Sequence, residues 1–338
     1  MKNKSMIKET KLTKDQLKNE EILDFVLQVA YRKQTGDWIQ YWNGNGYCEL
    51  NKNDGTMITT ILNDDEEFEP EFALNIDCNI SNRCNNGCVF CYQGCTSNGK
   101  EADIKKFLED KNSWLYSLHE GTELALNGNE PLHPDLPLLL KFCKERNIFA
   151  NLTVRENTLL QHQSQIERWL RERLIHGIGI SPSEYSLEMI QFCQEHPTAV
   201  IHTIAGITTI QQYKYLADKG LKILILGYKN FGKGVDYKKE CSEMINGKLQ
   251  DLKKEVKWFP EMFKVVSFDN LAIEQLDVKD ILTEKEWDTF YRGDDGNHTL
   301  FIDLVDEIYA KNSIQSKAQK YPLMTDIRDM LKDIRRRK

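Results

Sequence analysis

Apolar segments typical of buried β-strands alternate with helical segments between residues 72 and 226, and this alternation constrains the fold more than any other feature. Strands that alternate with helices pair in parallel, because each helix returns the chain to the start of the next strand. The pattern therefore predicts an α/β domain whose strands all end at one edge of a sheet. The six predicted strands are Phe72–Ile76, Leu124–Leu126, Phe149–Val154, Gly177–Ile180, Val200–Ile204 and Leu221–Leu226.

Helical periodicity occupies the intervals between these strands. After the fourth strand, a helix is expected to begin at Ser181 and Pro182, because proline is favoured in the first helical turn. The other predicted helices are Ile104–Leu118, Leu136–Arg146, Leu159–Ile175 and Ile210–Asp218.

Three cysteines follow the first predicted strand with the spacing C-x3-C-x2-C. Cys84, Cys88 and Cys91 lie within the run RCNNGCVFCY, on the loop past the carboxyl end of the strand. Three thiolates are one fewer than the four that complete a structural zinc site or saturate a cubane iron–sulfur cluster. A cluster held by three cysteines keeps one iron open, and an open iron can bind a small molecule and act on it.

A second motif follows the second predicted strand. It reads Asn127-Gly128-Asn129-Glu130-Pro131 and continues as Leu132-His133-Pro134. Taken alone, it is an ordinary turn between a strand and a helix. Both motifs follow strands, and parallel α/β folds place their sites on the loops at the carboxyl ends of strands.

Together the two motifs resemble those of radical S-adenosylmethionine (radical SAM) enzymes, in which aromatic residues such as Phe90 and Tyr92 flank the last cysteine. The resemblance implies a [4Fe-4S] cluster on Cys84, Cys88 and Cys91, with SAM bound at the open iron. It implies reductive cleavage of SAM to a 5′-deoxyadenosyl radical, which abstracts a hydrogen atom from a C–H bond of the substrate. It also implies a partial (β/α)6 TIM-like barrel, with N-terminal and C-terminal α+β extensions in this chain.

The resemblance further assigns cofactor-binding residues. The family's G-G-E-P-like turn binds the SAM amino group, and here Asn129 replaces its second glycine. Asparagine tolerates positive φ better than most residues, so the turn can be kept. For each of the loop residues beyond the two motifs, a plain loop role is the alternative. The residues assigned to SAM are Tyr92, Asn127, Gly128, Asn129, Glu130, Pro131, Arg155, Asn157, Ser181, Ile204, Gly206, Gly227 and Tyr228.

The segment Gly227–Tyr237, GYKNFGKGVDY, combines three glycines with two lysines after an apolar strand. Such a loop can bind an anion through its backbone N–H groups, or it can be a flexible turn at the edge of the barrel. Its position after a strand favours a loop on the substrate or SAM side of the site. It is not a phosphate-binding P-loop, because the G-x4-G-K-[ST] order is absent.

The spacing of the remaining cysteines does not indicate a second metal site. Zinc sites use paired cysteines, and no second pair follows downstream. A single cluster is therefore expected. Cys78 and Cys95 flank the cluster loop, where either could donate a hydrogen atom to a substrate radical or simply pack beneath the loop. Cys143 and Cys193 lie among apolar neighbours and are expected to be buried.

Three domains are predicted: an N-terminal extension over residues 1–71, the barrel over 72–258 and a C-terminal region over 259–338 that covers the barrel. The first holds a charged helix to Lys33, short strands from Trp38 to Leu62 and an acidic linker around residues 64–69. In the last, strands that close the open side of the barrel precede a helix. Its predicted strands and helix are Val265–Phe268, Leu271–Leu276, Thr299–Val305, Glu307–Ala310 and Met324–Lys338.

The composition indicates the class of protein and its cellular location. The 338 residues are 40% hydrophobic with a net charge of −7, which is typical of a soluble globular protein and argues against binding nucleic acid through a basic face. No apolar run is long enough for a membrane span and no signal peptide is recognisable, so a cytoplasmic location is expected.

The expected partners are an electron donor such as flavodoxin or ferredoxin and a substrate. The substrate is a peptide or protein side chain, or else a nucleoside or other small molecule. Strand edges in the flanking segments, with which an extended chain could pair, slightly favour the peptide. The alternative from another class is a non-catalytic iron–sulfur or zinc protein that uses its metal for binding or sensing.

Overall fold

The computed structural model describes the backbone of residues 14–61, 67–291 and 293–337, and the side chains of these from residue 24 onward. The described strands are β1 (Trp38–Asn43), β2 (Gly46–Asn51), β3 (Met57–Ile61), β4 (Asn75–Asn79), β5 (Glu123–Gly128), β6 (Phe149–Arg155), β7 (Gly177–Ser181), β8 (Ala199–Ile204), β9 (Lys222–Leu226), β10 (Val265–Phe268), β11 (Thr299–Asp303), β12 (Ile308–Ala310) and β13 (Lys320–Pro322). The described helices are α1 (Lys14–Thr35), α2 (Ile104–Glu109), the 3₁₀ helix η1 (Trp114–Ser117), α3 (Leu136–Glu145), α4 (Glu156–Gln161), α5 (Gln163–Arg171), α6 (Leu187–Glu195), α7 (Ile210–Leu216), α8 (Lys233–Glu255), α9 (Phe259–Met262), α10 (Asn270–Leu276), α11 (Glu284–Phe290) and α12 (Ile327–Arg336), with short 3₁₀ turns η2 (Val256–Trp258), η3 (Val278–Ile281) and η4 (Lys317–Gln319).

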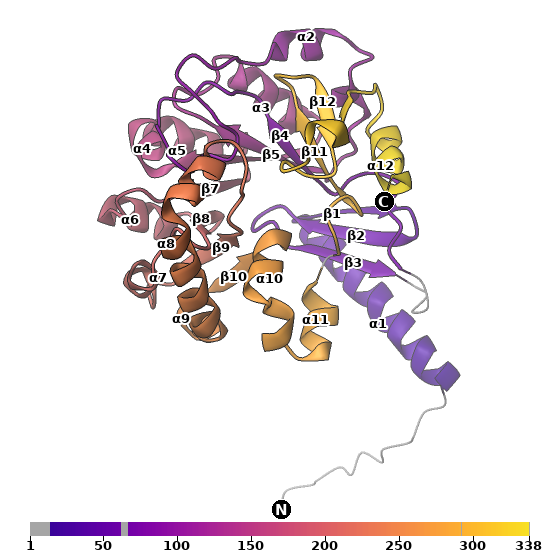
Figure 1. Cartoon of the computed structure of the whole chain (residues 1–338). Coiled ribbons are helices and arrows are strands. Elements are labelled where there is room, and N and C mark those ends of the chain that lie inside the picture. The colour runs from indigo at the N-terminus through magenta and orange to yellow at the C-terminus, as the bar shows by residue number, and fades with distance from the viewer. Residues whose placement is uncertain (1–13, 62–66, 292, 338) are drawn as a thin grey trace, which may run out of the picture.

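These strands form two sheets (Figure 1). The larger has ten strands in the order β10-β9-β8-β7-β6-β5-β4-β11-β12-β13. It is parallel from β10 to β11, and β12 and β13 add antiparallel strands at one edge. The smaller is the antiparallel sheet β1-β2-β3. The predicted α/β class with a parallel sheet is confirmed.

The parallel strands have an apolar face and a polar face, because side chains alternate along each strand and the register keeps like residues in line. The apolar face packs into the core, and Figure 1 shows helices such as α3 and α6 outside the strands. This face includes Ile76, Leu124, Leu152, Ile178, Ile201 and Ile223, all at most 2% exposed.

The opposite face, here called the inner face, carries polar side chains, and its middle is left uncovered by the residues that the structure describes. Asp77 is exposed in the middle of β4, and Asn75, Glu123, Asn151 and His202 are half-buried on their strands. A side chain on an interior strand can be exposed only where no other element packs over it. The inner face is therefore open to solvent near its centre.

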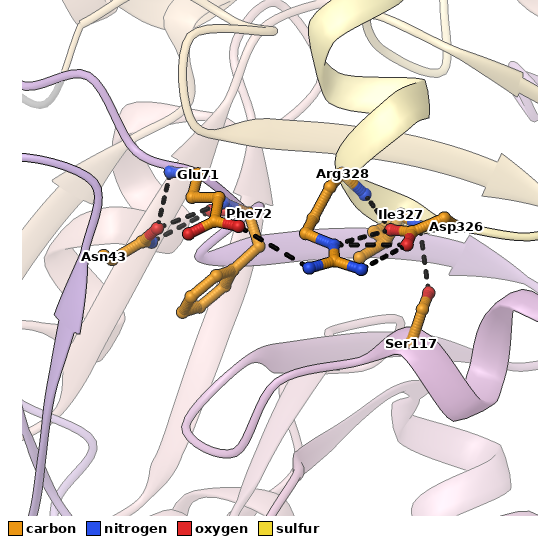
Figure 2. A network of polar contacts seen from close by, with 7 residues as sticks. All are labelled: Asn43, Glu71, Phe72, Ser117, Asp326, Ile327 and Arg328. Carbon is orange, nitrogen blue, oxygen red and sulfur yellow. Dashed lines mark hydrogen bonds and ion pairs between the residues drawn. The ribbon is translucent and has the colours of Figure 1, made fainter.

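The N-terminal sheet is fastened to the rest of the molecule by polar contacts. Figure 2 shows the amide of Asn43, at the end of β1, accepting hydrogen bonds from the N–H groups of Glu71 (2.7 Å) and Phe72 (3.0 Å). The Glu71 carboxylate pairs with Arg328 at the start of α12, 3.5 Å away. The segment that leads into β4 is thus bonded to the N-terminal sheet and to α12.

Helix α1 packs on the same sheet through ring and ion-pair contacts. Phe25 meets Tyr47 edge-to-face at 5.7 Å, and Arg32 pairs with the buried carboxylate of Glu49. The predicted N-terminal helix and short strands are confirmed. Residues 1–13 of the predicted charged segment, and residues 64–66 of the predicted acidic linker, lie outside the described residues.

One C-terminal prediction needs correction. The predicted strand Leu271–Leu276 is helix α10, because the Asp269 carboxylate caps it by accepting a hydrogen bond from the N–H of Ala272 (2.8 Å). The C-terminal strands extend both edges of the sheet, with β10 beside β9 and β11 beside β4. The predicted hairpin tip at residues 306–307 and the last helix are confirmed.

Other boundaries differ as well. Helix α6 begins at Leu187 and not at Pro182, because Ser186 caps it. The predicted helix Leu159–Ile175 is divided at His162 into α4 and α5, and the helix predicted from Ile104 ends early and is followed by η1. The first parallel strand starts three positions later than predicted, at Asn75. Among the described residues, no helix is long and apolar enough to span a membrane.

Candidate functional site

The cysteine loop, residues 80–96, leaves the carboxyl end of β4 and is tied to the loop after β5. Asn127 accepts a hydrogen bond from the N–H of Ile80 (2.7 Å) and donates one to the carbonyl of Ser81 (2.8 Å). Asn129 donates to the same carbonyl (2.6 Å), and the carbonyl of Glu130 accepts from the N–H of Asn85 (2.6 Å). The two motifs singled out in the sequence therefore form one structural unit.

The end of β6 also contacts the cysteine loop. The guanidinium of Arg155 donates a hydrogen bond to the sulfur of Cys88, with a nitrogen–sulfur distance of 2.6 Å. Asn157 donates to the side-chain oxygen of Asn86 (2.7 Å). Two residues assigned to SAM by resemblance thus lie against the loop that carries the cysteines.

The loop after β9 reaches the cysteine loop from the other side. The N–H of Lys233 donates to the carbonyl of Cys91 (3.0 Å), and its ammonium donates to the carbonyl of Cys95 (2.6 Å). Gly232 has φ +53° and leaves no room for a side chain, since a Cβ there would lie 2.4 Å from the carbonyl oxygen of Tyr92. The glycine-rich segment is therefore a close-packed partner of the cysteine loop.

We expect Gly232→Ala to disturb this contact, because the new methyl group must push the two backbones apart at a positive φ. The expected cost is about 1–3 kcal/mol of unfolding free energy, with weaker iron retention after reconstitution. Urea denaturation and iron analysis measure both effects. The matched control is Gly247→Ala within α8, where a Cβ meets nothing within 4 Å and should stabilise the helix by up to about 1 kcal/mol. Equal stability changes in the two variants would contradict the packing argument.

The sulfur of Cys91 lies in a nest of hydrogen-bond donors. A hydrogen bond from the Cys95 thiol and bonds from the N–H groups of residues 93–95 outweigh burial and lower the pKa of Cys91 to about 6. The hydrogen bond to Cys91 and burial raise the pKa of Cys95, so its proton stays on the Cys95 sulfur. The amide of Asn129 lies 3.8 Å from the same sulfur. Cys95 is thus a fourth thiol beside the motif, held in a donor role.

The residue types of the motif, and not their arrangement, are those of an iron–sulfur site. In the described part of the chain, no group of three or more His, Cys, Asp or Glu side chains that could hold a metal ion is found. In a [4Fe-4S] cluster the protein ligands are cysteine thiolates, and hydrogen bonds to the sulfurs tune the cluster. The motif supplies three such ligands on one loop, with donors already directed at the sulfurs of Cys88 and Cys91.

The turn after β5 is held firmly beside this loop. Its Glu130 carboxylate lies 3.0 Å from Nε2 of His162 at the junction of α4 and α5. The buried ring of His133 contacts the carbonyl of Ala102 through Nε2, at 2.9 Å. At Gly128 a Cβ would lie 2.5 Å from the side chain of Val154, so only glycine fits between β5 and β6. The turn is therefore packed too closely to be a mobile connection.

Glu156 is a buried residue that the sequence did not single out. It is 1% exposed, and its carboxylate accepts hydrogen bonds from the N–H groups of residues 183–186 at 2.7–3.0 Å. Burial acts to raise the pKa of Glu156, but bonds from Ser186 and its neighbours outweigh burial and leave that pKa lowered. This carboxylate fixes the loop that follows Ser181. In the sequence, Glu156 could have been noticed as a charged residue directly after a predicted strand.

Two opposite charges face the inner surface below the cysteine loop. Asp77 lies on β4, and burial raises its pKa to about 6. The residue is nevertheless exposed to solvent on the inner face of β4. Lys229 follows β9, and its ammonium lies 4.3 Å from the centre of the Tyr92 ring. Burial and the charge of Lys229 lower the pKa of His202 on β8 to about 4.

The other predicted site residues have varied surroundings. Ser181 and Ile204 end strands on the inner face, whereas Gly206 packs against α8. The N–H groups of Gly227 and Tyr228 are held by Asp269 and by Gln275 of α10. For these residues, no hydrogen bond to the cysteine loop is found in the described structure.

Cys78 is buried in the hydrophobic core, on the opposite face of β4 from Asp77. Cys143 and Cys193 are buried, as predicted. A role in hydrogen donation for Cys78 and Cys95 stays a prediction, as do the domain boundaries.

Two comparisons of the sequence with known proteins gave no match. No protein-family model matches this chain, and no curated protein is significantly similar to it in sequence.

Proposed function

We propose that the protein is a radical SAM enzyme that reductively cleaves SAM and abstracts a hydrogen atom from a C–H bond of its substrate. One observation carries the proposal: the C-x3-C-x2-C loop is joined by direct hydrogen bonds to the Asn127–Pro131 turn. A passive iron–sulfur protein needs the cysteines but has no use for a second motif that binds an amino group. A [4Fe-4S] cluster would supply the electron and the open iron for SAM cleavage.

The geometry of the sheet supports a partial barrel. The loops after β4 and β9 touch through Lys233 and Gly232, although β5 to β8 lie between these strands in the sheet. Neighbouring strands are about 4.8 Å apart, so a flat sheet would hold the ends of β4 and β9 about 24 Å from each other. Curvature of the sheet shortens the distance that the two loops must span to meet. The partial (β/α)6 barrel provides that curvature and a concave inner face.

In this proposal the cluster ligands are Cys84, Cys88 and Cys91. Other residues of the chain position SAM and the substrate and shield the reacting groups. Arg155 donates a hydrogen bond to the sulfur of Cys88, and the Cys95 thiol donates one to the sulfur of Cys91. The turn from Asn127 to Pro131 binds the amino group of SAM. The inner face holds the substrate close to the reacting carbon, because the selectivity of a reactive radical comes from positioning.

The proposed partners are an electron donor such as flavodoxin or ferredoxin and a substrate on the inner face. A peptide side chain and a small metabolite are both compatible with the chemistry. The inner face carries Asp77, Glu123 and Lys229 and is therefore suited to a polar, charged substrate.

The test is anaerobic reconstitution of the full-length protein with iron and sulfide, followed by dithionite and SAM. We expect 5′-deoxyadenosine to form and to increase when cell extract supplies a substrate. If fully reconstituted protein releases no 5′-deoxyadenosine, the enzyme proposal fails and a non-catalytic iron–sulfur protein is left.

A further inference from the structure

A cavity of about 510 Å³ lies at the amino edge of the large sheet, where β7 and β8 begin. It is lined by His176, which precedes β7, and by Pro197 and Thr198, which precede β8. The cysteine loop leaves the carboxyl end of β4, which runs parallel to these strands in the same sheet. The cavity and the cysteine loop therefore lie at opposite edges of the sheet, separated by the five residues of β7, which span about 16 Å.

Positive side chains from two parts of the chain line this cavity. Lys52 belongs to the turn between β2 and β3, whereas Arg171 ends α5 and Arg173 follows it. Among the residues that the structure describes, none of the three forms an ion pair. Arg173 donates one hydrogen bond, to the side-chain oxygen of Asn53 at 3.0 Å, so its guanidinium keeps further N–H groups for a ligand.

The cavity also has two carboxylates in its lining, and neither is paired with these cations. Glu167 accepts a hydrogen bond from Gln163 (2.8 Å), and Glu195 accepts one from Gln191 (2.7 Å), in each case from one helical turn before. The lining thus holds three cations and two carboxylates, although the chain as a whole has a net charge of −7. Positive charge is therefore concentrated here against the average of the molecule.

His176 gives a second indication of positive potential at this wall. Its ring stacks on Phe149 at 4.1 Å, and its buried Nδ1 has no hydrogen-bond partner in the described structure. Burial, followed by the charges of Arg173 and Lys144, lowers the pKa of His176 to about 4. The charges that act on this ring are both positive, so the local potential favours an anion.

We infer that this cavity binds the phosphate group of a small molecule such as a nucleotide or a sugar phosphate. Guanidinium groups bind phosphate through paired N–H donors, and the volume lies in the range of small-molecule sites. Glu167 and Glu195 can accept hydrogen bonds from hydroxyl or amino groups of the same ligand. The ligand would contact both Lys52 and the end of α5, and so join the N-terminal sheet to the parallel sheet. This site is separate from the one proposed for SAM.

Calorimetry with the full-length, oxygen-free protein at physiological ionic strength tests the ligand class. The probes are inorganic phosphate, ribose 5-phosphate, AMP and ATP, and ribose and adenosine are the matched controls that lack phosphate. At least one phosphate ester should bind, and its unphosphorylated counterpart should bind about tenfold more weakly or worse, because it lacks the charge-assisted contacts. Absence of binding by every probe at millimolar concentration, or equal binding of the unphosphorylated counterpart, would overturn the inference.

Histidine signals in NMR spectra locate the ligand in the unaltered protein. His176 and His196 line the cavity, whereas His133 and His162 lie beside the turn after β5, at the other edge of the sheet. The phosphate ester that binds should shift the signals of the first pair and leave those of the second pair unchanged. Each signal is assigned by its loss in a variant such as His176→Asn. Shifts confined to His133 and His162 would place the ligand at the cysteine loop and contradict the assignment.

Variants test the cationic side chains. Lys52→Gln, Arg171→Gln and Arg173→Gln should each weaken binding about tenfold or more, and Arg173→Lys should weaken it less than Arg173→Gln, because it keeps the charge. The matched controls are two exposed cations outside the lining, Arg168→Gln on the same helix as Arg171 and Lys214→Gln on α7. Both should bind as the unaltered protein does. Indifference to all three glutamine substitutions would overturn the inference.

Thermal unfolding gives an independent measure. A ligand that binds only the folded protein raises Tm as its concentration increases. The rise should appear in the unaltered protein and in Arg168→Gln, and it should be lost in Arg173→Gln. A rise of the same size in Arg173→Gln would contradict the site. None of these measurements requires cleavage of SAM, so the cavity and the proposed enzyme are tested separately.

Discussion

Alanine at Cys84, Cys88 or Cys91 is expected to abolish both the iron–sulfur chromophore and SAM cleavage. Each substitution removes one of only three thiolates proposed to hold the cluster, and two thiolates leave half of its irons without a protein ligand. The measurement is iron and sulfide content with the visible absorption spectrum after anaerobic reconstitution, followed by the 5′-deoxyadenosine assay. Loss of the cluster should be essentially complete in each of the three variants.

Two other cysteines make this experiment selective. Cys241→Ala, in α8 and outside the motif, is the matched control and should retain iron and activity. Cys95→Ala is the sharper comparison, because the Cys95 thiol hydrogen bonds to the Cys91 sulfur and could compete as a fourth ligand. We expect Cys95→Ala to retain its cluster. Loss of the cluster in Cys95→Ala, or its retention in a motif variant, would show that the ligands have been assigned wrongly.

Glu156→Gln is expected to destabilise the fold by about 2–4 kcal/mol, because a carboxylate that accepts hydrogen bonds from four backbone N–H groups is replaced by an amide that can accept at one atom only. The amide NH₂ group would also face those N–H donors. Urea denaturation at pH 7.5 measures the loss. The matched control is the exposed Glu188→Gln in the first turn of α6, which should change stability by less than about 0.5 kcal/mol.

The effect of Glu156→Gln should depend on pH in a defined direction. The lowered pKa of Glu156 means that its contribution is fully present above the ordinary glutamate pKa of about 4.3 and is lost as pH falls through the folded value. The difference between the unaltered protein and the variant should therefore shrink in acid. A difference that is small at pH 7.5, or that grows on acidification, would contradict the role assigned to this carboxylate.

The positions of most parallel strands could be predicted because each carries apolar residues that pack into the core. Segments such as Phe149–Val154 and Leu221–Leu226 differ from the observed β6 and β9 by one residue at one end. The first strand was misplaced because Phe72 and Ala73 are buried before β4 begins, whereas β4 itself alternates with the polar Asn75 and Asp77. Its polar inner face weakened the apolar signal on which the prediction depended.

Local capping explains another error. The apolar run Leu271–Leu276 resembles a strand by composition, but Asp269 precedes it at the capping position and the segment is helical. The aspartate was visible in the sequence and could have decided the assignment. Pro182 led to a different error. It suggested the start of a helix, but the helix begins later, where Ser186 caps it.

The pairing of the cysteine loop with the turn after β5 could be expected, because neighbouring parallel strands end at the same edge. The contact between the loop after β9 and the cysteine loop could not. It depends on how far the sheet curves between β4 and β9, and strand periodicity does not contain that angle.

The most direct test of the central claim is spectroscopy of the unaltered, oxygen-free protein before and after SAM is added. The account predicts about four irons per chain in a cluster with one site that has no cysteine ligand. It also predicts that SAM changes the Mössbauer and electron paramagnetic resonance signals of that site. Absence of iron, or a cluster with four protein thiolates whose spectra do not respond to SAM, would contradict it.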